Sequence, residues 1–116
     1  MRRDPHLLTA ADVGDRERVF AALGDGTRLA LVAKLSSGGP YSISRLTSGS
    51  PLTRQAITKH LRVLEGAGIV HSIRKGREIV FDFDPKPLVE LKEYLEMVSR
   101  QWDERLARLK RFVEQP

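Results

Sequence analysis

The sequence predicts one mainly α-helical domain that carries a small β-hairpin. Three observations support this prediction. Apolar residues recur with helical spacing in five segments, and they alternate with polar residues only after Gly68. The chain has 116 residues, of which 41% are hydrophobic and 30% charged. This size and composition are typical of a single domain with one modest core, here residues 1–116.

The first two helices are expected at residues 10–23 and 28–35. The first has an apolar face on one side and ends before Gly24, which breaks the helical pattern. The second is densely apolar, as expected of a largely buried helix, and either Asp25 or Thr27 can cap its start.

A pair of shorter helices is expected next, within residues 42–47 and 54–67. Thr53 is a good N-cap for the second of them, and glycines mark its end. Its apolar stripe has i, i+4, i+7 spacing and consists of Ile57, Leu61 and Leu64. A tight turn therefore joins two helices, as in a helix-turn-helix.

After Gly68 the apolar period changes to two, which predicts two strands. Residues Ile69, His71 and Ile73 are expected on one face of the first strand. In the second, Ile79, Phe81 and Phe83 are expected to alternate with Glu78, Val80 and Asp82. Gly76 lies between the strands and supplies the positive φ of a hairpin turn.

A long final helix is expected at about residues 85–114, with Asp84 as its cap and Pro85 at its first position. Such a helix is about 45 Å long, and so small a core cannot cover it. Its apolar residues follow a near-heptad spacing, which favours pairing with a second copy of the chain. The expected dimer interface, on this helix and the first one, comprises Val13, Phe20, Leu91, Leu95, Val98, Trp102, Leu106 and Leu109.

The positive charge of the chain is concentrated in one place. The net charge is +5, and the 25 residues from Thr53 to Arg77 hold six basic residues and one acidic residue, so they account for all of it. A concentrated basic patch predicts a polyanionic partner, and double-stranded DNA fits a polar helix beside a basic hairpin.

The residues expected to bind DNA come from the helix that begins at Arg54 and from the hairpin tip. They are Thr53, Arg54, Gln55, Thr58, Lys59, Arg62, Arg74, Lys75 and Arg77. Arg54 can pair with guanine and Gln55 with adenine. Lys59 and Arg62 are expected to bind phosphates. The order of elements, α-α-α-α-β-β-α, is that of a winged helix-turn-helix.

Two segments carry a recognisable pattern: Leu52–Val70 (LTRQAITKHLRVLEGAGIV) and Ala22–Leu29 (ALGDGTRL). Together with a wing that ends in Gly76-Arg77, they closely resemble the ArsR/SmtB, or arsenic-repressor, family of bacterial transcription regulators. The resemblance implies a homodimer built from the first and last helices. It also implies binding to an inverted-repeat operator, and repression until an inducer arrives.

The sequence departs from this family at its metal sites. Ser42 and Ser44 stand where the arsenic- and cadmium-sensing members have paired cysteines, and a serine hydroxyl is a poor ligand for a soft metal. The other family site lies on the last helix, where Asp103 and Glu104 have no histidine beside them. We therefore expect no metal and no cofactor. The sequence leaves three alternatives open for the inducer: a small organic molecule, a partner protein, or none at all.

Several function classes are disfavoured. The chain has no cysteine, and its first 13 residues have no apolar run longer than Leu7-Leu8, so we expect a cytoplasmic protein without a targeting segment or membrane association. No enzyme motif is present. The alternative to a DNA-binding regulator is a winged-helix module that binds another protein.

Two features also allow alternatives. His60 lies beside the apolar stripe, where a packed, hydrogen-bonded histidine is more common than a ligand or a pH switch. Trp102, with Tyr94 and Met97, either packs in a dimer core or lines an effector pocket between the last helices of a dimer.

Overall fold

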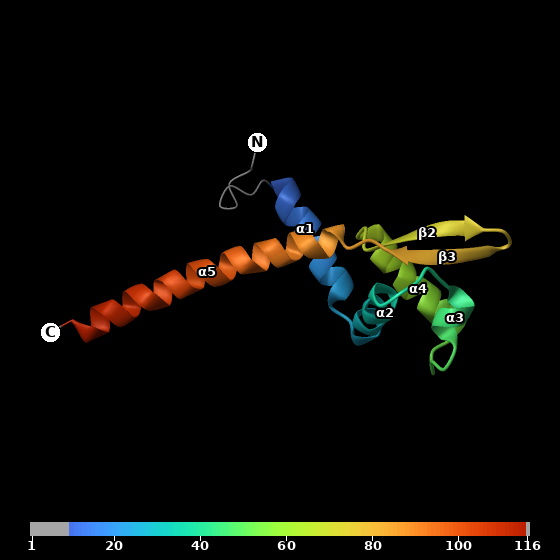
Figure 1. Ribbon diagram of the computed structural model, residues 1–116, viewed down its shortest axis with the longest axis horizontal. Coiled ribbons are helices and arrows are strands. Elements are labelled where there is room, and N and C mark those ends of the chain that lie inside the picture. Colours follow the sequence, from blue (N-terminus) through green and yellow to red (C-terminus); the bar gives the residue numbers. More distant parts are fainter. Residues whose placement is uncertain (1–9, 116) are drawn as a thin grey trace.

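A computed structural model describes residues 10–115 of the chain, with side chains from residue 12 onward. Residues 1–9, which bear on the expected lack of a targeting segment, lie outside the described part. The elements, in chain order, are α1 (Ala10–Leu23), α2 (Gly26–Ser36), β1 (Tyr41–Ser42), α3 (Ile43–Thr47), α4 (Arg54–Gly66), β2 (Val70–Lys75), β3 (Glu78–Phe83) and α5 (Lys86–Glu114). Figure 1 shows a body made of α1 to α4, from which the β2–β3 hairpin and α5 extend in different directions.

The predicted mainly helical class is confirmed, and the sheet has one strand more than expected. The two-residue strand β1 pairs antiparallel with β3, so the strand order is β1-β3-β2. Tyr41 lies opposite Phe81, and Ser42 lies opposite Val80. A strand of two residues has no period that a sequence pattern could reveal, which is why it was not predicted.

Side-chain caps fix where the helices begin. Asp25 and Thr53 accept hydrogen bonds from the amides three residues ahead, at 3.0 and 3.1 Å, and so cap α2 and α4 as expected. The cap predicted for α5 is wrong by one position. Asp84 Oδ1 accepts from the Lys86 amide at 3.0 Å, but Pro85 occupies the cap position itself.

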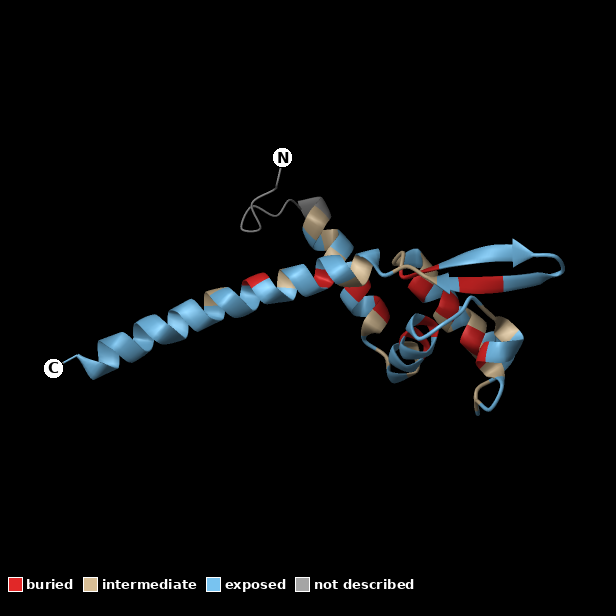
Figure 2. Cartoon of the chain, in the orientation of Figure 1, coloured by how far each residue is buried: buried red, intermediate tan, exposed pale blue. Residues whose placement is uncertain are grey.

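The core lies where α4 meets α1, α2 and the base of the hairpin (Figure 2). The predicted stripe of α4 is fully buried there, together with Phe81 of β3. The predicted alternation of the hairpin is partly wrong, since Val80 is only 7% exposed and Ile79 is 42% exposed. Val80 is in the middle of the central strand, between Ser42 and Ile73, whereas Ile79 lies nearer the wing tip and is paired on one side only, with Arg74.

The first part of α5 packs on α1, and the rest extends away from the body, so that the molecule measures 71 Å along its longest axis (Figure 2). Leu91 was expected at the dimer interface, but it is 7% exposed and belongs to the core of its own chain. The other apolar residues of the predicted seam are exposed, among them Trp102 at 58%. No helix in the described part of the chain is long and apolar enough to cross a membrane.

Candidate nucleic-acid interface

The turn between α3 and α4 presents the polar face of α4 to solvent. Ile57, Leu61 and Leu64 hold the opposite face in the core. Gln55 and Lys59 are exposed, and no hydrogen bond or ion pair of their side chains occurs within the described residues. These side chains therefore remain available to a partner.

Two further residues of this face make contacts within the chain. Arg54 Nη1 donates a hydrogen bond to Ser44 Oγ of α3 at 3.3 Å, and both side chains are exposed. Thr58 Oγ1 donates to the Arg54 carbonyl at 2.7 Å, which leaves its lone pairs as acceptors. The Arg54–Ser44 contact orients the guanidinium at the start of α4 without burying it.

The sequence predicts a phosphate contact for Arg62, and the structure adds contacts of this side chain within its own chain. Its Nη1 donates to Glu65 Oε1 at 2.7 Å, and its guanidinium lies 5.5 Å from the centre of the Phe81 ring. Its charge is thus balanced by a carboxylate and directed towards the wing. Arg62 therefore joins α4 to β3, and its phosphate contact stays a prediction.

Glu65 is the centre of this junction. Its Oε2 accepts hydrogen bonds from Ser72 Oγ at 2.6 Å and from the Ser72 amide at 3.1 Å. The Ser72 hydroxyl and then the Arg62 guanidinium hold the pKa of Glu65 below its usual value of 4.5, because they stabilise the charged carboxylate. Glu65 therefore fixes the base of the wing to α4, the helix expected to read DNA, which we call the recognition helix. We call Arg62, Glu65 and Ser72 the wing clamp.

The wing tip carries three exposed cations, Arg74, Lys75 and Arg77, as predicted. Gly76 between them has a φ of +63°, which residues with a side chain rarely adopt. The Arg74 Nε donates only a long hydrogen bond, 3.5 Å, to the Gly76 carbonyl. The tip therefore combines a defined turn with exposed positive side chains.

One further cation lies on the same region of the molecule and was not predicted. Arg45 is exposed on α3, the first helix of the helix-turn-helix, and its guanidinium lies 5.1 Å from the centre of the Tyr41 ring. Ser42 caps α3 by accepting from the Arg45 amide at 3.2 Å. The sequence signal was a basic residue on the short helix, although Arg45 lies outside the charged stretch of residues 53–77.

His60 is a packed, hydrogen-bonded histidine. Its Nδ1 lies 3.2 Å from Arg28 Nη1 and 3.8 Å from Asp25 Oδ2. The hydrogen bond from the Arg28 amide is the main reason that the pKa of Asp25 lies below its usual value of 3.8. The Arg28 and His60 charges lower this pKa further. This cluster connects the start of α2 to α4 and so helps to hold α4 in place.

Comparison with known proteins identifies the family. A model of the helix-turn-helix domain matches residues 23–73. The HTH-type transcriptional regulator YuzN of Bacillus subtilis is 42% identical over 84 residues, which cover 67% of this chain and 91% of that protein. The solved structure of an ArsR-like transcriptional regulator from Rhodococcus sp. RHA1 has a TM-score of 0.81 and 36% identity, with 92% of this chain and 100% of that chain covered. The chain belongs to the ArsR/SmtB family of DNA-binding transcriptional regulators.

A solved structure of lower sequence identity shows the same fold. It is the homodimeric winged helix-turn-helix DNA-binding domain Mb0332 from Mycobacterium bovis, with a TM-score of 0.62 and 20% identity over 92% of this chain and 93% of that chain. Within residues 12–115 of this ArsR-family regulator, no group of three or more His, Cys, Asp or Glu side chains is placed to hold a metal ion.

Proposed function

We propose that this ArsR-family regulator is a homodimeric repressor that binds an inverted-repeat operator. The observation that carries the proposal is the exposed polar face of α4, held by a buried apolar stripe and flanked by a basic wing tip. In this arrangement α4 enters the major groove and the wing contacts the adjacent backbone or groove.

Different residues of the interface have different roles. Arg54 and Gln55 at the start of α4 read base edges, because a guanidinium and an amide make paired hydrogen bonds to guanine and adenine. Thr53 and Thr58 assist them at a phosphate or a thymine methyl. The phosphate-binding cations, which set the register but not the sequence, are Lys59, Arg74, Lys75, Arg77 and Arg45.

The dimer is built from the exposed apolar residues of α1 and α5. Val13 and Phe20 of α1 lie beside α5, and the Phe20 ring packs edge-on against Tyr94 at 6.5 Å. The α5 seam continues along the helix at Leu95, Val98, Trp102, Leu106 and Leu109. Aromatic and large aliphatic residues of this kind form the buried centre of stable interfaces. The Mycobacterium bovis domain of the same fold is homodimeric, which supports an assembly of two chains.

Selection from random DNA duplexes tests the proposal. The repressor should recover an inverted repeat whose half-sites are about 34 Å, or one helical turn, apart. With five phosphate-binding cations in each protomer, the logarithm of affinity should fall with the logarithm of salt concentration at a slope of up to about −9. A module that docks on protein would recover no motif and would bind DNA weakly, and this result would rule out our proposal.

Three variants separate the roles of the side chains. Arg54→Ala should relax specificity at one base position and cost about 1–3 kcal/mol of binding free energy, whereas Lys59→Ala should weaken all sequences alike. Lys110→Ala also removes one positive charge, but it lies at the far end of α5, where it pairs with Glu114 at 4.0 Å, and it should have little effect. Equal losses in all three variants would show that only net charge matters.

Sedimentation equilibrium tests the dimer. The wild-type chain should sediment as a dimer, and Trp102→Ala should shift the equilibrium towards the monomer because it removes the largest side chain of the seam. Lys110→Ala again serves as the control on the same helix. A wild-type chain that stays monomeric at high concentration would contradict the dimeric part of the proposal.

A further inference from the structure

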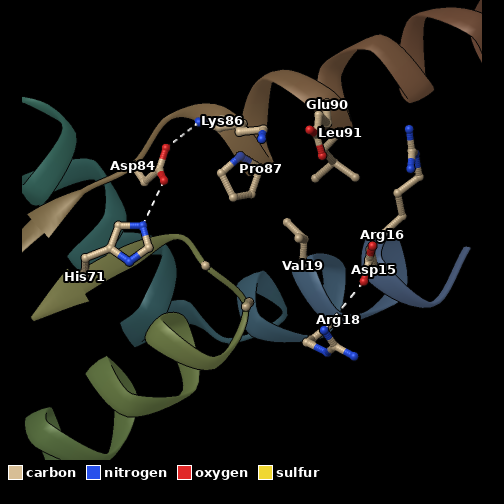
Figure 3. A pocket seen from close by; sticks show the side chains of 12 residues that line it. Asp15, Arg16, Arg18, Val19, His71, Asp84, Lys86, Pro87, Glu90 and Leu91 are labelled. Atoms are coloured by element: carbon tan, nitrogen blue, oxygen red, sulfur yellow. Dashed lines mark hydrogen bonds and ion pairs between the residues drawn. The ribbon is translucent and has the colours of Figure 1, made fainter. Parts of the chain in front are cut away.

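A cavity of about 370 Å³ lies where α1, α5 and the base of the wing meet (Figure 3). Arg16, Arg18 and Val19 line it from α1, and Lys86 and Leu91 line it from α5. His71 and Asp84 close the side that faces the wing. Its volume lies at the lower end of the range for small-molecule sites, about 300–1,000 Å³.

The charges around the cavity are balanced. Three acidic side chains, Asp15, Asp84 and Glu90, face three basic ones, Arg16, Arg18 and Lys86. A purely anionic ligand would meet the three carboxylates, and a purely cationic one would meet the three bases. A ligand that carries one charge of each sign avoids both penalties, because like charges at short range repel.

Some of these charges are already paired. Arg18 lies 3.6 Å from Asp15, and His71 Nε2 donates to the Asp84 carboxylate at 2.8 Å. Lys86 and Glu90 are different, since neither side chain makes an ion pair or hydrogen bond within the described part of the chain. They follow each other at i, i+4 spacing on the α5 wall of the cavity, so their charged groups lie on one face of the helix.

The floor of the cavity is apolar. Val19 and Leu91 belong to the hydrophobic core and are 7% exposed each, and Pro87 lies beside them on α5. A ligand with a short hydrocarbon body would bury that body on this floor, with its charged groups at the α5 wall. Figure 3 shows this arrangement, with Val19 facing Pro87 and Leu91 across the cavity.

We propose that the cavity binds a small zwitterion of amino-acid size with an apolar side chain. Its carboxylate pairs with Lys86, its ammonium group pairs with Glu90, and its side chain contacts Val19 and Leu91. The residue types fit this class of ligand. Neither Lys86 nor Glu90 makes a side-chain hydrogen bond or ion pair within the described residues, although the Lys86 charge also stabilises the Asp84 carboxylate.

The position of the cavity gives such a ligand a regulatory role, and this part of the inference rests on the proposed DNA-binding function. Asp84 joins the wing to α5. Its carboxylate accepts hydrogen bonds from the His71 ring and from the Lys86 amide. Its own amide donates to the Ile69 carbonyl at 2.8 Å. A ligand held by Lys86 therefore acts on the connection between the dimer helix and the wing. Such coupling typically changes DNA affinity by about 5- to 150-fold.

Titration calorimetry and NMR on the full chain test the binding. The probes are the apolar L-amino acids, with 4-methylpentanoate and 3-methylbutylamine as analogues of leucine that lack the ammonium group and the carboxylate respectively. At least one amino acid should bind and shift the amide signals of Gly68 and Leu91. The affinity of each single-charge analogue should be lower by at least roughly tenfold. If no amino acid perturbs these signals at millimolar concentration, or the analogues bind as tightly, the proposal is wrong.

Matched variants locate the site. Lys86→Gln and Glu90→Gln should each weaken the amino acid roughly tenfold, because each removes one ionic contact. Lys92→Gln removes the same charge from an exposed position on α5 that pairs with Glu96, outside the cavity, and should bind as the wild type does. An equal loss in Lys92→Gln would place the ligand elsewhere.

A DNA-binding assay with and without the amino acid then separates the two proposals. Amino-acid binding in a protein that selects no DNA motif would uphold the cavity and overturn the repressor function. Amino-acid binding that leaves operator affinity unchanged would overturn the regulatory role.

Discussion

The wing clamp provides the sharpest test of how the structure serves DNA binding. Glu65→Ala removes the 2.7 Å contact to Arg62 and the two hydrogen bonds from Ser72, at 2.6 and 3.1 Å. The Glu65 side chain is 30% exposed, so water replaces part of what is lost. The free energy of unfolding should fall by about 1–2 kcal/mol, or about 4–8 °C in melting temperature.

The same change should alter DNA binding in a way that lost stability alone cannot explain. Removing the Glu65 carboxylate releases Arg62 and raises the net charge of residues 53–77 from +5 to +6. Binding to non-specific DNA should then depend more steeply on salt, with a slope about 0.9 larger for each additional phosphate contact. Specific binding should weaken at the same time, because the wing is less firmly fixed to α4.

Thermal melting and fluorescence anisotropy at several salt concentrations measure these effects. Glu78→Ala is the matched control, since Glu78 is an exposed acidic residue of the same hairpin whose side chain makes no hydrogen bond or ion pair within the described residues. It should melt within about 0.5 kcal/mol of the wild type and leave the salt slope unchanged. If Glu65→Ala behaves like Glu78→Ala in both assays, Arg62 is not held by the wing clamp and our reasoning fails.

Three further changes test the core, the wing tip and the α5 junction. Leu61→Ala should cost about 2–5 kcal/mol in urea unfolding because Leu61 is fully buried, and a loss below 1 kcal/mol would contradict the described packing. Gly76→Ala should cost about 1 kcal/mol, since a φ of +63° is strained for alanine, and an unchanged melting temperature would show that the turn relaxes. The His71 ring and then the Lys86 amide lower the pKa of Asp84 from its usual value of 3.8, because both donate to the charged carboxylate. Charged Asp84 therefore stabilises the fold above about pH 4, and this stabilisation is lost as the pH falls through the pKa of Asp84 in the folded state. Urea unfolding at a series of pH values should therefore show that the difference in stability between the wild type and Asp84→Asn becomes smaller as the pH falls below 3.8, the usual pKa of this carboxyl. A difference that grows as the pH falls would refute the assignment.

Local patterns predicted most of the fold, because helix periodicity and caps depend on residues close together in the chain. The ends of α1 and α4 were placed within a residue, and Thr53 was correctly predicted as a cap. The burial of Val80 could not be predicted from alternation, since it depends on β1, a strand contributed by a distant segment. Leu91 matched the heptad spacing, but the spacing does not show how much of α5 the body already covers.

The candidate site shows the same limit. Sequence alone placed the charges of the recognition helix and wing tip, and the exposure of Gln55 and Lys59 agrees with that prediction. The i, i+3 spacing of Arg62 and Glu65 on α4 is a local signal for their ion pair. The contact of Ser72 with Glu65 has no such signal, because Ser72 reaches Glu65 only when the hairpin folds back on α4. The cavity between α1, α5 and the wing was equally invisible, since residues from 15 to 91 line it and no local spacing connects them.

The exposed end of α5 links folding to protein concentration. No residue of α5 after Met97 is buried against the rest of its own chain. An isolated helix of about 15 residues is only marginally stable in water. Under the proposed pairing, this segment is fully helical only while a second copy covers it. Dilution should thus lower the helical signal in circular dichroism and expose Trp102 and its neighbours to proteases, so that degradation would remove single chains and spare paired ones.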